Sequence, residues 1–325
     1  MSLTRRAAQY VLVVMVALSI NFTLPRAMPG GPLRAIAGEE ARLLSPEARQ
    51  ELLARYGLDR PLTTQLADYL RSVATGDLGR SLNDKRPVTT RILERLPWTL
   101  LLMGASLVVI VVVGVAFGVL SGAARTSRGG LGSLVAFLAL DAMPPFWIGM
   151  LLILAFSVHL HLLPAFGAVV LDPDARGAAW LFEVARRLAL PVTTLVLAGV
   201  GQTYLLVRYS MLSVMGSGYV LMARAKGLSG GRILFRHALP NAVLPVHTHV
   251  MLELGWLLGG AVVVETVFSY PGLGRMLFEA VLARDYPLLQ GAFLLLTLTI
   301  IGMNLLADLT YPLLDPRVRR ETATT

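Results

Sequence analysis

The chain has 325 residues, of which 55% are hydrophobic and 15% charged, and its mean hydropathy is +0.66. Soluble globular proteins carry about 25% charged residues, so this composition excludes a protein wetted on all sides. The net charge of +9 suits nucleic acid or anionic lipid, and the long apolar runs favour basic loops at a membrane surface. The chain contains no cysteine, which excludes disulfides and cysteine metal sites.

Six apolar stretches have the length of a membrane-spanning helix, which is about 20 residues. They lie between Arg6 and Arg26, between Arg95 and Arg125, from Leu131 to about Leu163, between Arg187 and Arg208, from about Val243 to Phe268, and between Asp285 and Asp308. As one straight helix the third would extend roughly 50 Å. Pro144-Pro145 are therefore predicted to kink or break it.

The basic residues of the short loops predict that both chain ends are cytoplasmic. The cytoplasmic segments would then hold Arg5 and Arg6, Arg125 and Arg128, a basic group around residue 230, and Arg317, Arg319 and Arg320. Arg186 and Arg187 are an exception, because they would lie outside. The first apolar run could instead be a cleaved signal peptide, but it is long for one and no A-x-A site follows.

The segment from Met28 to about Arg95 is predicted to face outward as a small helical cap. Ser45 is an expected N-cap with Pro46 at the first helical position, and Gly57 is expected to end that helix. A second helix is expected from Leu62 to Ala74, ending before Gly76.

No catalytic constellation is present. A phosphate-binding loop needs Gly-Lys followed by Ser or Thr, but Lys85 follows Asp84 and Lys226 follows Ala225. The histidine pairs His159/His161 and His247/His249 are spaced by two, which on a helix points them about 200° apart and makes them poor chelators. Packing or interfacial histidines are the preferred interpretation, and the chain is not expected to be an enzyme.

The segment ARAKGLSGGRILFRHALPNAVLP, from Ala223 to Pro245, is the most distinctive part of the chain. It carries Arg224, Lys226, Arg232 and Arg236 and no acidic residue. Its pattern predicts a helix–turn–helix on the cytoplasmic face, with Gly227 at the turn and Pro240 ending the second helix. A solvated basic loop against lipid headgroups is the alternative.

The spacing within this segment resembles the cytoplasmic "EAA" loop of ABC-importer permeases. Gly227 is followed by nine residues and then by His237-Ala238-Leu239-Pro240, as in the glycine, nine residues and hydrophobic-x-Leu-Pro ending of that loop. The chain departs from the pattern at Leu221-Met222-Ala223, where Glu-Ala-Ala is typical. The peptide branch of the family often lacks that glutamate.

Nearly the whole chain is similar to the B-type permease of the dipeptide/oligopeptide/nickel importer family. The matching segments are RYGLDRPLTTQ (55–65), GDLGRSL (76–82), RPVTTRILERLPWTLLL (86–102), GGAVVVETVFSYPGLGRML (259–277), RDYPLLQG (284–291) and NLLADLTYPLLDPRVR (304–319). Each is weak alone, but their order is specific. SRGGLGS (127–133) departs from the family, which commonly has an aspartate there.

The resemblance implies an all-α integral membrane protein of six transmembrane helices with the type I ABC-importer permease fold, in the bacterial inner membrane. Its expected divisions are an anchor helix (1–27), an extracytoplasmic helical loop (28–94), the permease domain (95–312) and a cytoplasmic tail (313–325). Expected partners are the lipid bilayer, a second homologous permease, two ATP-binding subunits and an extracytoplasmic substrate-binding protein. ATP and magnesium would bind the ATPase subunits, and no cofactor, metal or nucleic acid is expected on this chain.

Peptides are the expected substrate, with nickel, glutathione or an oligosaccharide as alternatives within the class. A stand-alone secondary transporter is the alternative of another class, but such proteins usually show internal repeats or several midplane charges, and no clear repeat is present. A membrane enzyme would need a catalytic constellation that the sequence lacks.

The resemblance also implies roles for individual residues. The loop that couples to the ATPases would comprise Ala223, Arg224, Ala225, Lys226, Gly227, Arg232, Arg236, His237, Leu239 and Pro240. Apart from the resemblance, an intramembrane acid costs about 2.5–3.5 kcal/mol at a helix centre, so Asp141 and Glu253 are predicted to face the translocation path or the bundle interior. Pairing with a neighbouring side chain is the alternative for Asp141. Glu265, with Pro271 and Gly272, is predicted to be structural at the outer face, and Asp308 and Asp315 to fix the inner end of the last helix.

Overall fold

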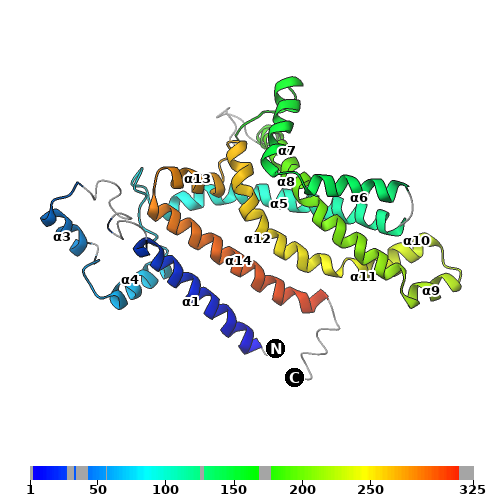
Figure 1. The fold of residues 1–325 in the computed structure, drawn as a ribbon, viewed down its shortest axis with the longest axis horizontal. Coiled ribbons are helices and arrows are strands. Elements are labelled where there is room, and N and C mark those ends of the chain that lie inside the picture. Colours follow the sequence, from blue (N-terminus) through cyan, green and yellow to red (C-terminus); the bar gives the residue numbers. More distant parts are fainter. Residues whose placement is uncertain are drawn as a thin grey trace. The chain divides into compact units, whose positions relative to one another are not determined.

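The computed structural model describes residues 3–27, 33, 43–55, 57–124, 128–167 and 177–314, and over these the chain is helical with one isolated β-bridge, between Arg80 and Pro87. Figure 1 shows the order of the elements. They are α1 (Leu3–Ala27), α3 (Pro46–Arg55), α4 (Leu62–Ala74), α5 (Val88–Ala123), α6 (Arg128–Asp141), α7 (Pro145–Leu152), η2 (Ile153–His159, a π-helix), α8 (Ala178–Met215), α9 (Gly218–Ala225), α10 (Gly230–Arg232), η3 (Ile233–Ala238, a π-helix), α11 (Leu239–Ala242), α12 (Leu244–Val267), α13 (Leu273–Leu282) and α14 (Tyr286–Leu314).

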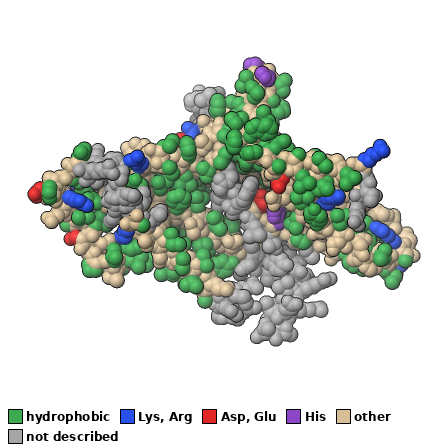
Figure 2. All heavy atoms as spheres, in the orientation of Figure 1, with side chains coloured by type: hydrophobic (Ala, Val, Ile, Leu, Met, Phe, Trp, Pro, Cys, Tyr) green, Lys and Arg blue, Asp and Glu red, His purple; other side chains and the backbone are tan. Residues whose placement is uncertain are grey.

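Several of these helices are long and apolar enough to cross a membrane. Among the described residues they are α5, α8 and the part of α14 from Tyr286 to Leu306, and α6 with the α7–η2 segment forms a fourth, bent candidate. A shorter apolar stretch covers Ala8–Thr23 of α1. Figure 2 shows apolar side chains over much of the described surface, as expected where lipid rather than water is the neighbour. The count of six spans stays a prediction.

The predicted break in the third apolar stretch is confirmed. α6 ends at Asp141, α7 begins at Pro145, and the two helices are bent by 100°. Pro144 takes an extended conformation, with φ −61° and ψ 136°, because the residue before a proline is pushed out of the helical region. Pro145 then occupies the first helical turn, where its missing N–H is not needed.

The chain divides into two compact units. Unit 1 comprises residues 1–99 and 272–302, and unit 2 comprises residues 100–271 and 303–325. The four-part division of the chain expected from the sequence stays a prediction.

In unit 1 the two short helices of the loop follow the sequence pattern. The Ala48 amide donates to Ser45 Oγ at 3.2 Å, so Ser45 caps α3 as predicted. Beyond α3, Gly57 has φ +64°, a conformation that favours glycine. α4 covers Leu62–Ala74, and Gly76 after it has φ +76°. These predictions are confirmed.

A buried aspartate joins two of the signature segments of unit 1. Asp285, which is 1% exposed, accepts hydrogen bonds from the Ser81 hydroxyl, from the Leu82 amide at 3.1 Å and from the Leu288 amide at 3.3 Å. It therefore caps the start of α14 and binds the GDLGRSL segment at the same time. The helix starts of unit 1 also pack closely, since a Cβ on Gly291 would lie 2.5 Å from Val88 Cγ1.

In unit 2, α8 is the central helix. In the most apolar 18 residues of α8, 67% are buried, against 28% in the corresponding part of α5. α8 contacts α6, α7, α11 and α12. α5 approaches it through a stripe of glycines: a Cβ on Gly114, Gly118 or Gly122 would lie 2.5–2.8 Å from side-chain atoms of Thr203, Val207 or Met211. Small residues permit such close helix packing in membranes.

The basic residues of α8 are not placed as the sequence suggested. The apolar stretch predicted for the fourth span ends at Arg208, but α8 continues to Met215 and Arg208 is 5% exposed. Its Nη1 donates to the backbone oxygen and to Oγ of Ser121, both at 3.2 Å. Ser121 Oγ in turn lies 2.7 Å from the Tyr204 hydroxyl. Two oxygen acceptors of Ser121 therefore hold the buried guanidinium through its Nη1.

Arg186 and Arg187, the two exceptions to the charge rule, bind the backbone of the preceding loop. Arg186 Nη2 donates to Leu162 O at 3.2 Å, and Arg187 Nη1 donates to Phe166 O at 3.1 Å. Both also pair with Glu183 at 3.4 Å. These contacts give the two arginines a structural role at the start of α8.

Candidate functional site

The basic segment around residue 230 forms a compact helical hairpin. α9 ends at Ala225, and Gly227 takes φ +75°. The Gly227 amide donates to Arg224 O at 2.9 Å and the Leu228 amide to Ala223 O at 3.3 Å, which closes the end of α9. The sharp turn at Gly227 is where the sequence predicted it.

A small apolar cluster holds the hairpin together. Val220 and Ala223 of α9 are buried against Ile233 of η3, with Leu228 of the turn packed on them. Ala238 and Ala242 are buried against Val207 and Met211 of α8. The hairpin is thereby fixed to the inner bundle of unit 2 by apolar contacts rather than by charge.

The charged side chains of the hairpin are exposed. Arg224, Lys226, Arg232 and Arg236 all project from its surface, as does Ala225. None of the four cations forms an ion pair with another described residue. His237 and Leu239 are half-buried, and the His237 carbonyl accepts a hydrogen bond from Asn241 Nδ2 at 2.8 Å.

Three large apolar side chains accompany these cations, and reasoning from charge alone missed them. Leu221 is 56% exposed, Met222 59% and Phe235 64%. A mixed apolar and basic surface of this kind is typical of a contact face, since apolar residues supply binding energy and charges supply orientation. We call the exposed cations together with Leu221, Met222 and Phe235 the hairpin face.

The prediction that Pro240 ends the second helix of the hairpin is wrong. Helical backbone runs from α10 through η3 and α11 to Ala242, with Pro240 in the first turn of α11. The π-helical turns of η3 precede the proline, and such turns use i→i+5 hydrogen bonds. Helical backbone therefore continues for two residues beyond Pro240.

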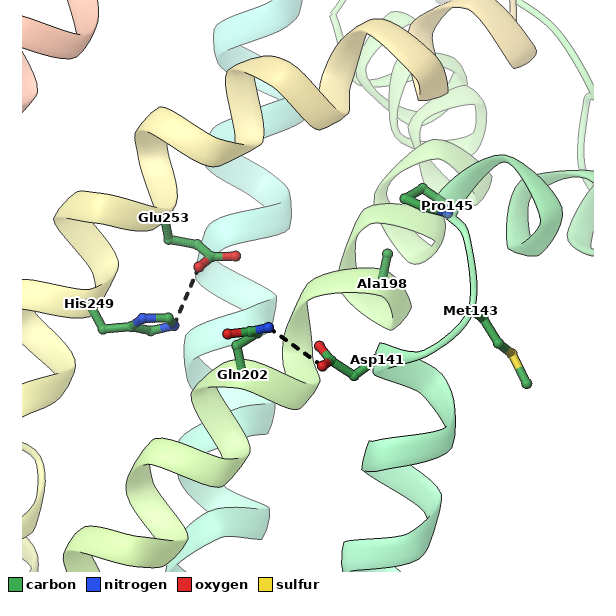
Figure 3. Close-up of a pocket in the computed structure, with 7 residues that line it drawn as sticks. All are labelled: Asp141, Met143, Pro145, Ala198, Gln202, His249 and Glu253. Atoms are coloured by element: carbon green, nitrogen blue, oxygen red, sulfur yellow. Dashed lines mark hydrogen bonds and ion pairs between the residues drawn. The ribbon is translucent and has the colours of Figure 1, made fainter.

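A second candidate site lies within unit 2, where the structure brings Asp141 and Glu253 to one cavity (Figure 3). The cavity has a volume of about 280 Å³. Its lining residues are Asp141, Met143, Pro145, Ala198, Gln202, His249 and Glu253. They come from the end of α6, the turn before α7, and the helices α8 and α12.

The polar side chains of this cavity point toward one another in Figure 3, whereas Met143 points away. Gln202 Nε2 lies 3.5 Å from Asp141 Oδ2, and His249 Nε2 lies 3.3 Å from Glu253 Oε2. The histidine and glutamate are within ion-pair distance, but His249 Nε2 makes no hydrogen bond to a described residue. Gln202 and His249 were not predicted as site residues. His249 could have been predicted from its spacing, because residues four apart, such as His249 and Glu253, lie on one helix face.

Glu265, Pro271 and Gly272 occupy the end of α12 and the start of α13. Glu265 is fully buried in unit 2, and its backbone oxygen accepts a hydrogen bond from the Tyr270 amide at 2.8 Å. The pKa of Tyr270 is raised, mainly by burial and secondly by the nearby charge of Glu265. The Tyr270 hydroxyl and the Glu265 carboxylate are therefore neighbours. Pro271 is half-buried, and Gly272 is the N-cap residue of α13 in unit 1. Their outer-face role stays a prediction.

The remaining candidates can be placed briefly. His159 ends η2 and His161 follows it with φ +53°; both are exposed. In the described part of the chain no group of three His, Asp or Glu side chains could hold a metal ion. Asp308 lies in α14 but its side chain is outside the described residues, as are Asp315 and the side chain of His247.

The arrangement of helices defines the class of protein. It is similar to the MetNI methionine ABC transporter solved in inward-facing conformations, with a TM-score of 0.56 and 16% identity, over 69% of this chain and 96% of that one. It is also similar to the crystal structure of an amino acid ABC transporter with histidines, with a TM-score of 0.50, 16% identity and coverage of 70% and 94%. The fold is that of a type I ABC transporter permease.

The sequence comparisons identify the family. Residues 114–320 match binding-protein-dependent transport system inner membrane components, and residues 1–103 match the N-terminal region of such components. The chain belongs to this family and is an integral inner membrane permease, as its sequence motifs predicted.

Its relatives include named peptide permeases. It is 38% identical to the dipeptide transport system permease protein DppB of Escherichia coli, over 93% of this chain and 94% of the relative. It is 37% identical to a putative peptide transport system permease protein of Brucella abortus, over 97% and 98%. It is also 37% identical to the di/tripeptide transport system permease protein DppB of Pseudomonas aeruginosa, over 93% and 94%.

Proposed function

We propose that this chain is the transmembrane permease subunit of an ATP-driven importer of dipeptides and oligopeptides. The observation that carries the proposal is 37–38% identity to named peptide permeases over more than nine-tenths of the chain. The chain forms one half of the translocation path, and a second homologous permease forms the other. An extracytoplasmic binding protein delivers the peptide, and two ATP-binding subunits carry ATP, magnesium and the hydrolysis reaction.

The hairpin face couples this chain to an ATPase subunit. Its exposed Leu221, Met222 and Phe235 would enter an apolar groove of the ATPase, while the surrounding cations meet acidic groups at the groove rim. Because apolar contacts fix the hairpin to α8, a movement of the ATPase would be transmitted to the bundle rather than absorbed by the loop.

The membrane topology follows from this role. Six spans, with both termini cytoplasmic, put the hairpin face on the ATPase side and unit 1's loop between α1 and α5 on the outer side. The buried Asp285 contacts hold this loop to the start of α14, which would give a docking binding protein a fixed surface.

The decisive experiment is purification of the tagged chain from membranes with identification of every co-purifying protein, followed by reconstitution. We expect a second permease and Walker-motif ATPases, and ATP-dependent uptake of dialanine into proteoliposomes when the cognate binding protein is added. ATP omission and a hydrolysis-deficient ATPase are the controls. Isolation of the chain alone, with transport that needs no ATP, would overturn the proposal in favour of a secondary transporter.

A further inference from the structure

The cavity of Asp141 and Glu253 has the charge of a cation-binding site. Among the described residues that line it, two are carboxylates and none is lysine or arginine. Arg208, a basic residue of the same helix α8 as Gln202, is turned away to Ser121. Asp141 is also the last residue of α6, and the C-terminal end of a helix carries partial negative charge. Carboxylates and helix end therefore act together to favour a positive ligand.

Glu253 is the group in this cavity that needs a partner. Its side chain is 7% exposed, and it makes no hydrogen bond to any described residue; the His249 ring at 3.3 Å is its one polar neighbour at ion-pair distance there. Figure 3 shows its carboxylate turned toward the cavity rather than along its own helix. A buried carboxylate without hydrogen bonds is costly, and a ligand that donates them would remove that cost.

The depth of Glu253 in the membrane also indicates a role in ligand binding. A Cβ on Gly199 would lie 3.1 Å from Ile110 Cδ1 and 3.4 Å from Glu253 Oε1, so these two side chains are at one level of the bundle. Ile110 is about midway along the uncharged stretch of α5 from Leu96 to Ala123. The carboxylate is therefore near the bilayer midplane, where ionisable residues mark substrate paths.

The helix break beside the cavity supports a path rather than a packing role. Non-helical backbone at membrane depth is tolerated where it lines a water-filled cavity, and discontinuous helices build substrate sites in transporters. The break between α6 and α7 runs from Asp141 to Pro145, both of which line the cavity.

We propose that this cavity binds the protonated amino group of the peptide as it crosses the membrane, a proposal that rests on the function proposed above. An ammonium group offers three N–H donors. Glu253 and Asp141 accept from it, and Gln202 holds Asp141 in place. A volume of about 280 Å³ suits the amino end of a peptide rather than a whole long chain. Every unmodified peptide has this group, so the site recognises the class without selecting a sequence.

The test uses the purified importer with its partner subunits in proteoliposomes and dialanine as cargo. Glu253→Gln and Asp141→Asn are each expected to lower ATP-dependent uptake about tenfold, with the same amount of assembled complex. Glu279→Gln is the matched control, because this acid lies on α13 in unit 1 and is 44% exposed. It is expected to transport as the wild type does. Glu253→Asp keeps the charge and is expected to restore part of the uptake.

A binding measurement separates amine recognition from a structural effect. Saturation-transfer NMR on the importer without its binding protein is expected to detect bound dialanine. In the Glu253→Gln importer the dialanine signal should be at least five times weaker. N-acetyl-dialanine should give no signal with the wild-type importer. Uptake within twofold of wild type in both variants, or equal binding of the acetylated peptide, would overturn the proposal and leave the importer function standing. No ATP-dependent uptake of dialanine by the wild type would instead remove the importer function and this inference with it.

Discussion

At the scale of single residues, Gly227 is the position where backbone conformation and proposed function meet. Its φ of +75° lies in the left-handed region, and a Cβ there would meet no atom of the described residues within 4 Å. Space is therefore not what excludes a side chain at this position. The backbone conformation excludes a β-branched side chain, because such a residue at positive φ is a genuine outlier.

We expect Gly227→Val to reduce ATP-dependent transport at least tenfold while ATP hydrolysis by the assembled complex continues. The strain of about 1–3 kcal/mol would turn α9 relative to the rest of the hairpin and misalign the hairpin face. Gly231→Val is the matched control: it is in the same hairpin, also has no atom within 4 Å, and lacks a positive φ. Parallel measurement of uptake and ATPase activity checks this, and equal uptake in the two variants would contradict it.

The residues that could be predicted from sequence are those whose reason is local. Ser45 and Gly57 at the ends of α3, and Gly227, act through neighbours within a few positions. Asp285 and Arg208 could not be predicted in their observed roles. The Ser81 partner of Asp285 is 204 residues away along the chain, and the Ser121 partner of Arg208 is 87 residues away. A single sequence does not reveal which distant groups the fold brings together.

At the scale of elements, three glycines of α5 permit its close approach to α8 in unit 2. The three glycines of α5 are four residues apart, so they lie along one face of the helix. Without a water-driven hydrophobic effect in lipid, close van der Waals packing of this kind carries helix association.

Gly118→Val is expected to lower the thermal stability of the purified protein by several degrees, because its Cβ would lie 2.7 Å from Val207 Cβ and 2.9 Å from Tyr204 O. Overpacking of this kind typically costs about 1–3 kcal/mol. Gly104→Val is the control on the same helix, since Gly104 is exposed and a Cβ there would meet no described atom within 4 Å. Thermal unfolding of the two variants in detergent checks this prediction. Equal midpoints would contradict it, because they would mean that forcing the two helices apart costs no stability.

The elements themselves were largely predictable, because apolar length and proline position act locally. The break after Asp141 followed from Pro144-Pro145, and α4 and α12 match the stretches expected for them. Pro240 shows the limit of that reasoning. A proline stops an α-helix by removing an i→i−4 hydrogen bond, but the π-helical turns of η3 change that bond pattern, and the sequence gives no sign of them.

At the scale of the whole molecule, the positive charge has a functional distribution. The net charge of +9 could serve anionic lipid alone. However, the hairpin face combines cations with exposed apolar side chains, and that combination suits a protein partner with an apolar groove and an acidic rim. The cations are Arg224, Lys226, Arg232 and Arg236, and the apolar residues are Leu221, Met222 and Phe235. Lipid contact and ATPase contact make different predictions for charge reversal.

If the hairpin face binds an ATPase, the double change Arg232→Glu and Arg236→Glu should reduce the co-purifying ATPase about tenfold. Arg128→Glu should not, although Arg128 is also exposed and is placed on the same membrane side by the proposed topology. Headgroup contact alone would make all of these arginines equivalent and leave the ATPase bound in every variant. Salt gives a second measure, because the Debye length falls from about 10 Å at 0.1 M to about 3 Å at 1 M. Wild-type complexes should lose ATPase across that range. Complexes that resist it would indicate that Phe235 and its apolar neighbours hold the subunits together and that the cations only orient them.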